Sequence, residues 1–242
     1  TWLYPTRTQK DPVKVTVQRP ADGKTWTVEL TPTQLPQWGG PAPTSATLLP
    51  GGVVKIPVPG FTPDIAKQVI KAIDDIRKTD AVRGVVLDLR GNHGGDPAEV
   101  GRLLGAFVHD KVWGHSCDVK DRCRPEYRTD DTVPLLNLPL VVLTDGQTVS
   151  AGDAFAMAVK DFGIGKLVGT RTAGIASGDT HGYLLNDNNT LINMPSKHII
   201  GANGEIFAGI GVPPDHHVPL TPADISAGRD PGTDKAVQLL TS

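Results

Sequence analysis

The sequence predicts an α/β fold built around a mostly parallel sheet. Two apolar runs, residues 84–89 and 138–143, have the composition of strands that are buried on both faces. Segments with helical spacing of apolar residues lie before, between and after these two runs. Because strands that alternate with helices pair in parallel through crossovers, this order favours a mostly parallel sheet.

A β-hairpin is expected ahead of the main domain. Residues 13–19 and 25–31 alternate between apolar and polar side chains on the two sides of a glycine-containing turn. A lone hairpin is marginally stable in water, so residues 1–31 are expected to be the end of a truncated domain. Residues 32–50 are rich in Pro, Thr and Gly and have the composition of a linker. The main domain is then expected over residues 51–242.

The main domain is expected to begin with a strand followed by an amphipathic helix. Residues 53–58 form a short apolar run. Thr62, a first-turn proline and Asp64 then predict a helix start, and isoleucine and valine side chains recur at helical spacing over 65–76. The later elements are expected to be a strand at 84–89, a helix at 97–108, a strand at 138–143, a helix at 150–162, a strand at 166–169 and a β-rich stretch at 182–200.

The composition is that of an ordinary globular domain. Of the 242 residues, 38% are hydrophobic and 21% are charged, and the formal net charge is -2. Charges of both signs are scattered, so no basic stripe is present and nucleic acid is not an expected partner. No run approaches the roughly 20 apolar residues of a membrane span, and the N-terminus lacks the layout of a signal peptide. We therefore expect no membrane span, and any targeting segment to lie outside the sequence.

The two cysteines, Cys117 and Cys123, lie close together in a polar segment that is expected to be a loop. The charged neighbours suit solvent exposure and favour a local disulfide, which would indicate an oxidising compartment. Free thiols are one alternative, and a metal site that includes His115 is another. Three ligands without a fourth make a poor zinc site, so no metal is expected.

A glycine-rich turn directly follows the strand expected at 84–89. Gly91, Gly94 and Gly95 would let backbone N–H groups approach a ligand closely and point at a negative oxygen. Donors preset in this way suit an oxyanion hole, which stabilises a tetrahedral intermediate. The alternative is a strand-to-helix turn whose glycines serve packing alone.

Ser150 lies where a helix is expected to begin, after a second strand and turn. A serine at a helix N-terminus has its oxygen in a positive local potential, and the N–H of Ala151 is then free to bind an oxyanion. The alternative is ordinary helix capping, because Asp153 follows Ser150 by three residues. If the two strands are adjacent and parallel, the two donor-rich turns converge on one point.

Four segments together match the motifs of one peptidase family, in the family's order. They are residues 88–95, 148–153, 166–174 and 209–215. Together they resemble the tail-specific, or carboxy-terminal processing, protease family, which includes the tricorn core protease and the repeats of interphotoreceptor retinoid-binding protein. The resemblance covers about residues 51–240 and implies a crotonase-like or ClpP-like α/β domain. Family members usually carry a PDZ domain ahead of it, and residues 1–31 would correspond to the last strands of that domain.

The resemblance also implies roles for individual residues. Ser150 matches the nucleophile of a serine peptidase, and Gly94, Gly95 and the N–H of Ala151 match the oxyanion hole. Asp161 matches a polar position near the site of the bacterial enzymes, although a surface acid at a helix C-terminus explains it equally well. The family needs no metal and no organic cofactor.

The chain departs from the family at the general base, which a serine nucleophile requires. The bacterial enzymes have a lysine where this chain has Ile175. In the tricorn-like branch the base is a histidine upstream of the PDZ domain, assisted by a glutamate from whose position Glu205 is displaced by a few residues. The candidates for the base are a histidine upstream of Thr1, His181 and His93. The other histidines are expected to be structural or exposed.

The sequence thus predicts a secreted serine endopeptidase that recognises peptide C-termini or unfolded tails and cleaves by acyl transfer. Two other classes stay open. A non-catalytic module of the same fold, binding a peptide or an apolar ligand, would explain the missing lysine and the displaced glutamate. A crotonase-type acyl-CoA enzyme shares the architecture, but it explains neither the N-terminal hairpin nor a disulfide.

Overall fold

The structure is a computed structural model in which the chain forms two compact units. It describes residues 12–31, 45–176, 178–186 and 190–242. The smaller unit consists of Thr1–Ala42 and Leu220–Asp230, and the larger unit consists of Pro43–Pro219 and Pro231–Ser242. The residues that we consider for catalysis lie in the larger unit.

The smaller unit contains the predicted hairpin. Strands β1 (Val13–Gln18) and β2 (Thr25–Leu30) pair antiparallel, and the short helix α4 (Pro222–Ser226) belongs to the same unit. Apolar residues stand opposite one another across the two strands, so they share one face and leave the other face polar. The apolar pairs are Val13 with Leu30, Val15 with Val28, and Val17 with Trp26.

The larger unit is built on a six-stranded sheet in the order β12-β9-β8-β5-β4-β3. Its strands are β3 (Thr47–Leu49), β4 (Val53–Pro57), β5 (Gly84–Asp88), β8 (Leu140–Thr144), β9 (Gly165–Gly169) and β12 (His216–His217). All neighbours pair in parallel except β3, which is antiparallel to β4, so the predicted mostly parallel sheet is confirmed. Strand β3 and the first residue of the 3-10 turn η1 (Pro50–Gly52) lie in the stretch 32–50, whose composition indicated a linker, so the end of that stretch is part of the sheet.

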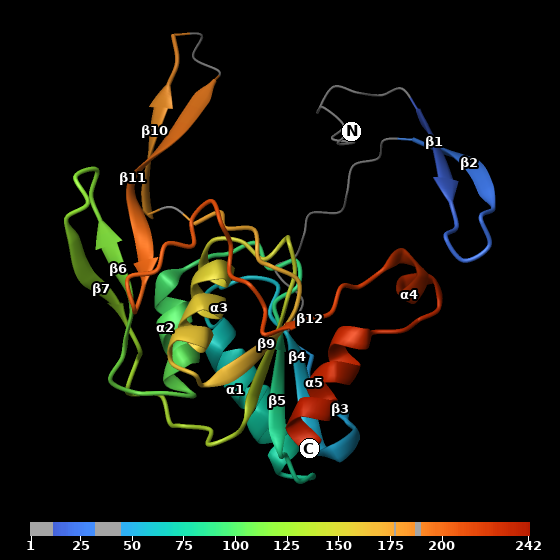
Figure 1. The fold of residues 1–242 in the computed structure, drawn as a ribbon, viewed down its shortest axis with the longest axis horizontal. Coiled ribbons are helices and arrows are strands. Elements are labelled where there is room, and N and C mark those ends of the chain that lie inside the picture. The colour runs from blue at the N-terminus through green and yellow to red at the C-terminus, as the bar shows by residue number, and fades with distance from the viewer. Residues whose placement is uncertain (1–11, 32–44, 177, 187–189) are drawn as a thin grey trace. The chain divides into compact units, whose positions relative to one another are not determined.

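Helices cover both faces of this sheet (Figure 1). On one face, α1 (Ile65–Arg77), α2 (Pro97–Gly105) and α3 (Ala151–Asp161) pack on strand side chains such as Leu87. On the other face, α5 (Pro231–Thr241) packs on Val86 and its neighbours. Successive strand residues therefore face opposite helical layers, which explains why the strands are apolar without alternation.

The start of α1 differs from the prediction that Thr62 would cap it. The helix begins after Asp64, which has a φ of 65° and no capping side-chain bond. Instead, the buried Glu99 of α2 accepts hydrogen bonds from Asp64 N (3.3 Å) and Ala66 N (3.1 Å), and it is paired with Arg102. A residue distant in sequence satisfies the helix N-terminus, so no local pattern could reveal this cap.

A second, four-stranded sheet has the order β10-β11-β6-β7. Its strands are β6 (Val112–Cys117), β7 (Cys123–Arg128), β10 (Gly178–Leu184) and β11 (Leu191–Gly201). The prediction of a polar loop around the cysteines was wrong, because Cys117 ends β6 fully buried and Cys123 begins β7 directly opposite it. Most of β7 is exposed and includes Pro125, so the segment lacks the alternation that identifies a strand. The β10–β11 hairpin extends beyond the six-stranded sheet (Figure 1).

Candidate active site

Ser150 lies in a sharp turn between β8 and α3. Its backbone has a φ of 56° and a ψ of −117°, a combination that residues with a side chain rarely adopt. The side chain is half-exposed and makes no capping hydrogen bond to the helix, so the structure disagrees with the capping interpretation. A strained strand-to-helix turn of this kind exposes the nucleophilic serine of α/β-hydrolases.

The side chain of Ser150 packs directly against Gly94. A Cβ atom placed on Gly94 would lie 2.6 Å from Ser150 Cβ and 3.1 Å from Ser150 Oγ. Gly94 has a φ of 86°, a conformation that also favours glycine. The structure therefore brings the hydroxyl of Ser150 to the glycine-rich turn.

Two backbone N–H groups beside Ser150 have no acceptor among the described residues. One belongs to Gly95, and the other belongs to Ala151 at the first position of α3. The N–H of Gly94 is different, because it donates to Oδ1 of Asn92 at 2.8 Å. Of the three residues predicted for the oxyanion hole, two thus present an open donor and one already has a partner.

The fully buried side chain of Asn92 holds the glycine-rich turn in place. Its Nδ2 donates to Val58 O (2.7 Å), and its Oδ1 accepts from Gly94. Its main-chain oxygen accepts from Val149 N (2.9 Å), the residue before Ser150. Asn92 therefore connects the end of β4, the glycine-rich turn and the serine turn.

Asp153 lies behind the serine turn and is fully buried. Its Oδ1 accepts from Gly174 N (2.8 Å), and Oδ2 is the one buried polar side-chain atom without a partner in the part of the chain that the structure describes. Burial raises the pKa of Asp153, although the hydrogen bond from Gly174 N acts in the opposite direction. Ser150 N in turn donates to Ile175 O (2.8 Å), so residues 172–175 line the back of the serine turn.

The general base is not identified among the described side chains, where no histidine or lysine is hydrogen-bonded to Ser150. Ile175, which the resemblance aligns with the bacterial lysine, is 66% exposed. The exposed His93 has its ring against Gly60, where a Cβ atom would lie 2.8 Å from His93 Nε2. The backbone of His181 pairs with Met194 in β10 and β11, but its side chain lies outside the described set.

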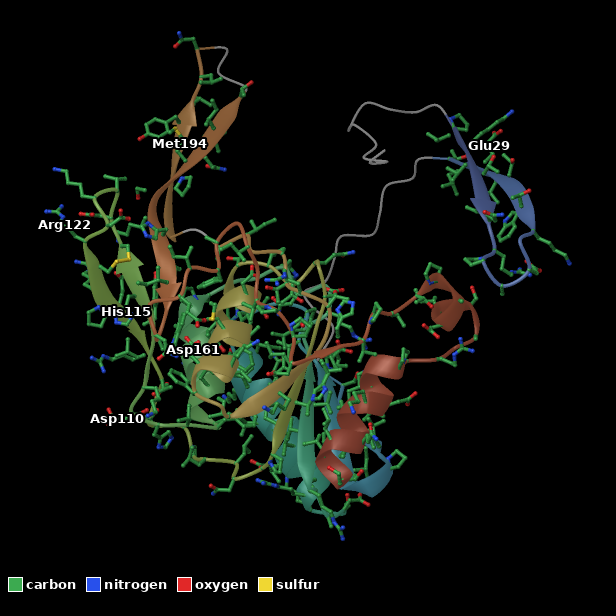
Figure 2. All side chains as sticks on the ribbon, viewed as in Figure 1. Glu29, Asp110, His115, Arg122, Asp161 and Met194 are labelled. Atoms are coloured by element: carbon green, nitrogen blue, oxygen red, sulfur yellow. A yellow bond between two sulfur atoms is a disulfide. The ribbon has the colours of Figure 1, made fainter. Side chains whose placement is uncertain are left out.

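Asp161 and Glu205 lie away from Ser150. Asp161 ends the 11-residue helix α3 that Ser150 precedes, which separates them by about 16 Å at about 1.5 Å per residue. Asp161 Oδ2 accepts from Ala202 N (2.9 Å), close to the strand that carries His115 (Figure 2). Burial raises the pKa of Asp161, and the nearby Glu205 raises it further. The structure therefore groups these two acids at the far end of α3.

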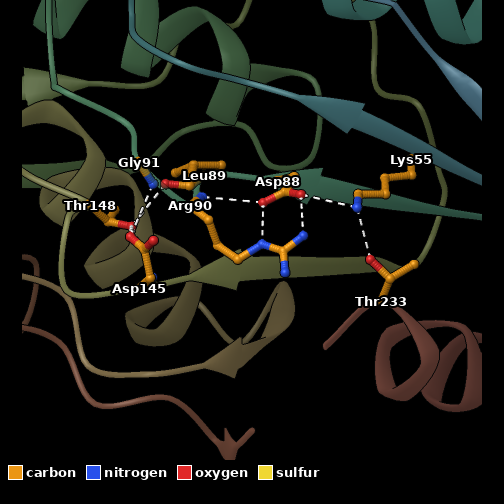
Figure 3. Close-up of polar contacts among 8 residues, drawn as sticks. All are labelled: Lys55, Asp88, Leu89, Arg90, Gly91, Asp145, Thr148 and Thr233. Atoms are coloured by element: carbon orange, nitrogen blue, oxygen red, sulfur yellow. Dashed lines mark hydrogen bonds and ion pairs between the residues drawn. The ribbon is translucent and has the colours of Figure 1, made fainter. Parts of the chain in front are cut away.

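An ion-paired cluster at the end of β5 was not recognised from the sequence. Arg90 Nε donates to Asp88 Oδ1 (2.8 Å), and Lys55 Nζ lies 3.1 Å from Asp88 Oδ2 (Figure 3). Burial alone would raise the pKa of Asp88, but Arg90 and Lys55 outweigh it and hold the pKa below its usual value. Lys55 also donates to Thr233 of α5 (2.8 Å). The sequence signal for this cluster was the spacing of Asp88 and Arg90. They are two residues apart at the end of a strand, which puts their side chains on the same face of the extended chain.

The cysteines form a disulfide between β6 and β7. This pairing rules out both the free thiols and the metal site with His115, whose Nδ1 lies 3.4 Å from Gly201 O. Within the described ranges, no group of three or more His, Cys, Asp or Glu side chains is placed to bind a metal ion. The helices in those ranges are all too short or too polar to cross a membrane.

Comparisons with known proteins agree with this geometry. The chain is 35% identical over 167 residues to "Tricorn protease homolog 1" of Streptomyces coelicolor, covering 68% of this chain and 15% of the homologue. It is 32% identical over 124 residues to the "Tail-specific protease" of Haemophilus influenzae, covering 50% of this chain and 17% of that protein. The chain thus spans less than a fifth of the length of either relative.

The structure resembles that of a photosystem II D1 C-terminal processing protease, with a TM-score of 0.67 and 25% identity. The likeness covers 96% of this chain and 60% of that one. A sequence match to Peptidase family S41 extends over residues 52–218. This range includes the glycine-rich turn and the turn that carries Ser150. The chain therefore belongs to Peptidase family S41, a family of serine-type peptidases.

Proposed function

We propose that the larger unit is the catalytic domain of a serine endopeptidase in which Ser150 is the nucleophile. The observation that carries this proposal is the position of its side chain, free of any helix cap and packed on the α-carbon of Gly94. Attack of Ser150 Oγ on a peptide carbonyl forms a tetrahedral intermediate, which collapses to an acyl-enzyme and releases the amine. Water then releases the acyl group.

The oxyanion hole of this proposal consists of the N–H groups of Gly95 and Ala151. Both are open donors among the described residues, and Ala151 adds the positive end of the α3 dipole. Gly94 contributes differently from the sequence-based expectation, because its N–H bonds to Asn92 and its missing side chain makes room for Ser150. Loss of one such donor typically lowers kcat by about 10²–10³-fold.

The base is proposed to come from a histidine upstream of Thr1 or from His181. The tricorn homologue is far longer than this chain, so an upstream segment is available in proteins of that kind. His181 lies in β10, which begins shortly after the segment that is hydrogen-bonded to Ser150. Either histidine would take the proton of Ser150 and later return it to the leaving amine.

The proposed substrate is a peptide or protein, engaged through its C-terminus. Relatives are named for tail-specific cleavage and for C-terminal processing, which supports this choice. Residues 1–31 are proposed to be the end of a PDZ-like domain and residues 51–242 the peptidase domain. Residues 32–50 are proposed to be a linker whose last residues, in β3, already join the sheet of the peptidase domain. The apolar face of the β1–β2 hairpin supports the PDZ-like assignment, because a hairpin with such a face is normally stable only as part of a larger domain. The Cys117–Cys123 disulfide supports secretion or an extracytoplasmic location.

The proposal is tested by hydrolysis of an unstructured peptide by the full-length protein. Ser150→Ala should abolish turnover while leaving the melting temperature unchanged. The matched control is Ser226→Ala in α4, which should retain wild-type turnover. Wild-type turnover by the Ser150→Ala variant would refute the proposal.

A non-catalytic peptide-binding function is the second candidate, and it is favoured by one observation. Ile175 supplies an apolar, exposed side chain where the bacterial enzymes have a basic one. This function predicts that the full-length protein binds a peptide, that Ser150→Ala binds it equally well and that neither hydrolyses it.

A further inference from the structure

We infer that Thr148 and Asp145 are positioning residues that hold the serine turn in register with the glycine-rich turn. This inference rests on the proposed function of Ser150. Neither residue contacts the reacting atoms, so each would act through the placement of Ser150 relative to Gly95. The inference starts from where the main-chain pairing of β5 and β8 ends.

Backbone pairing between these two strands stops before the candidate site begins. The last pair in register is Asp88 with Leu143, and the last bond runs from Leu89 N to Leu143 O (2.9 Å). Beyond this point the chains turn away into the two loops. Any further connection between them must come from other groups.

Thr148 supplies the first of these connections. Its fully buried hydroxyl donates to Leu89 O (2.8 Å), at the start of the glycine-rich turn. The same hydroxyl accepts from Asp145 N (3.1 Å), within its own loop. Thr148 stands two residues before Ser150, so this bond fixes the serine turn close to its reactive end.

Asp145 supplies the second connection (Figure 3). Its Oδ1 accepts from Gly91 N (3.0 Å) across the gap and from Gln147 N (2.9 Å) in its own loop. One carboxylate oxygen therefore joins the two turns. A third bond, from Val149 N to Asn92 O (2.9 Å), involves only main-chain atoms.

These bonds lie on both turns within a few residues of the proposed nucleophile and oxyanion hole. A displacement of about 1 Å at a reacting group can cost about 100-fold in rate. Because the strand pairing has already ended, the two side chains, together with the bond from Val149 N to Asn92 O, would set the distance between Ser150 Oγ and the open N–H groups. Their loss should affect the chemical step more than peptide binding.

The test compares two matched pairs of variants in the full-length protein. Thr148→Val removes the hydroxyl and keeps the shape, whereas Thr148→Ser keeps the hydroxyl. Asp145→Ala removes the acceptor, whereas Asp145→Asn keeps Oδ1. The rate of Ser150 labelling by a fluorophosphonate and the kcat and KM for an unstructured peptide are measured for each, together with the melting temperature.

We expect Thr148→Val and Asp145→Ala to lower kcat and the labelling rate by about 10- to 100-fold with KM within about twofold. The serine and asparagine variants should restore most of the rate. Wild-type labelling rates in folded Thr148→Val and Asp145→Ala would overturn the inference and leave the proposed function standing. If Thr148→Val does not fold, the half-exposed Asp145 pair decides the question. No labelling of the wild type would instead overturn both the proposed function and the inference.

Discussion

Ser150 and Gly94 are in direct contact, with Ser150 Cβ only 2.6 Å from the point where a side chain on Gly94 would begin. Two features therefore require glycine at position 94. A side chain there would collide with Ser150, and the φ of 86° favours a residue without a side chain. The two residues are distant in sequence and meet because β5 and β8 are parallel neighbours whose C-terminal ends share one edge of the sheet.

Gly94→Ala is expected to displace Ser150 and lower kcat/KM of the full-length protein by at least about 100-fold. The matched control is Gly204→Ala, because Gly204 has a similar φ of 82° and no atom within 4 Å of an added Cβ. The control should show only the backbone cost of about 1 kcal/mol in urea unfolding. Equal peptidase activity of the two variants would contradict the claim that the contact between Gly94 and Ser150 places the serine for catalysis.

Asp153→Asn is expected to remove a pH dependence of stability. Burial raises the pKa of Asp153 in the folded state. Its contribution to the free energy of unfolding is therefore fully present below the unfolded pKa of about 3.8, and it is lost as the pH rises through the folded pKa. Asparagine keeps the acceptor for Gly174 N and carries no charge. As the pH is raised from acid to neutral, the melting temperature of the wild type should fall relative to that of Asp153→Asn. Parallel curves would show that Asp153 does not titrate in this range.

Asp88→Asn is expected to remove a pH dependence of stability that has the opposite sign to that of Asp153. The pKa of Asp88 is lowered in the folded state, because Arg90 and Lys55 outweigh the effect of burial. Its contribution is therefore present above the unfolded pKa of about 3.8 and is lost as the pH falls through the folded pKa. At neutral pH the variant removes the carboxylate that Lys55 and Arg90 share and should lower the free energy of unfolding by about 3 kcal/mol. Chemical unfolding with no difference at pH 7 would be inconsistent with this cluster.

Reduction of the Cys117–Cys123 disulfide is expected to lower the free energy of unfolding by about 2 kcal/mol, the value for a short closed loop. Urea unfolding with and without a reductant measures this difference. A variant with both cysteines replaced by serine serves as the control and should not respond to the reductant. An equal response of both proteins would mean that the reductant acts elsewhere.

The core of the fold could be predicted because its signals are local. Residues 84–89, apart from Asp88, and residues 138–143 are apolar, and the helices of the larger unit show regular spacing, so the alternation of elements was visible. The cap of α1 by Glu99 was not visible, because it depends on a contact between two helices. Strand β7 was missed since its side chains are mostly exposed and polar.

The candidate site could be predicted only in part. Ser150 and the glycines stand out as motifs, and the parallel sheet brings them together. Whether Ser150 caps its helix could not be decided from the sequence, because the answer depends on its backbone angles. The occupied N–H of Gly94 depends on the orientation of the Asn92 side chain, which no pattern of residue types specifies.

The most direct test of Ser150 as the nucleophile is covalent labelling of the full-length protein by a fluorophosphonate, followed by mass spectrometry of its peptides. The account predicts one adduct, on Ser150, and none on the Ser150→Ala variant. A folded wild-type protein without an adduct, or an adduct that persists on another serine in the variant, would contradict it.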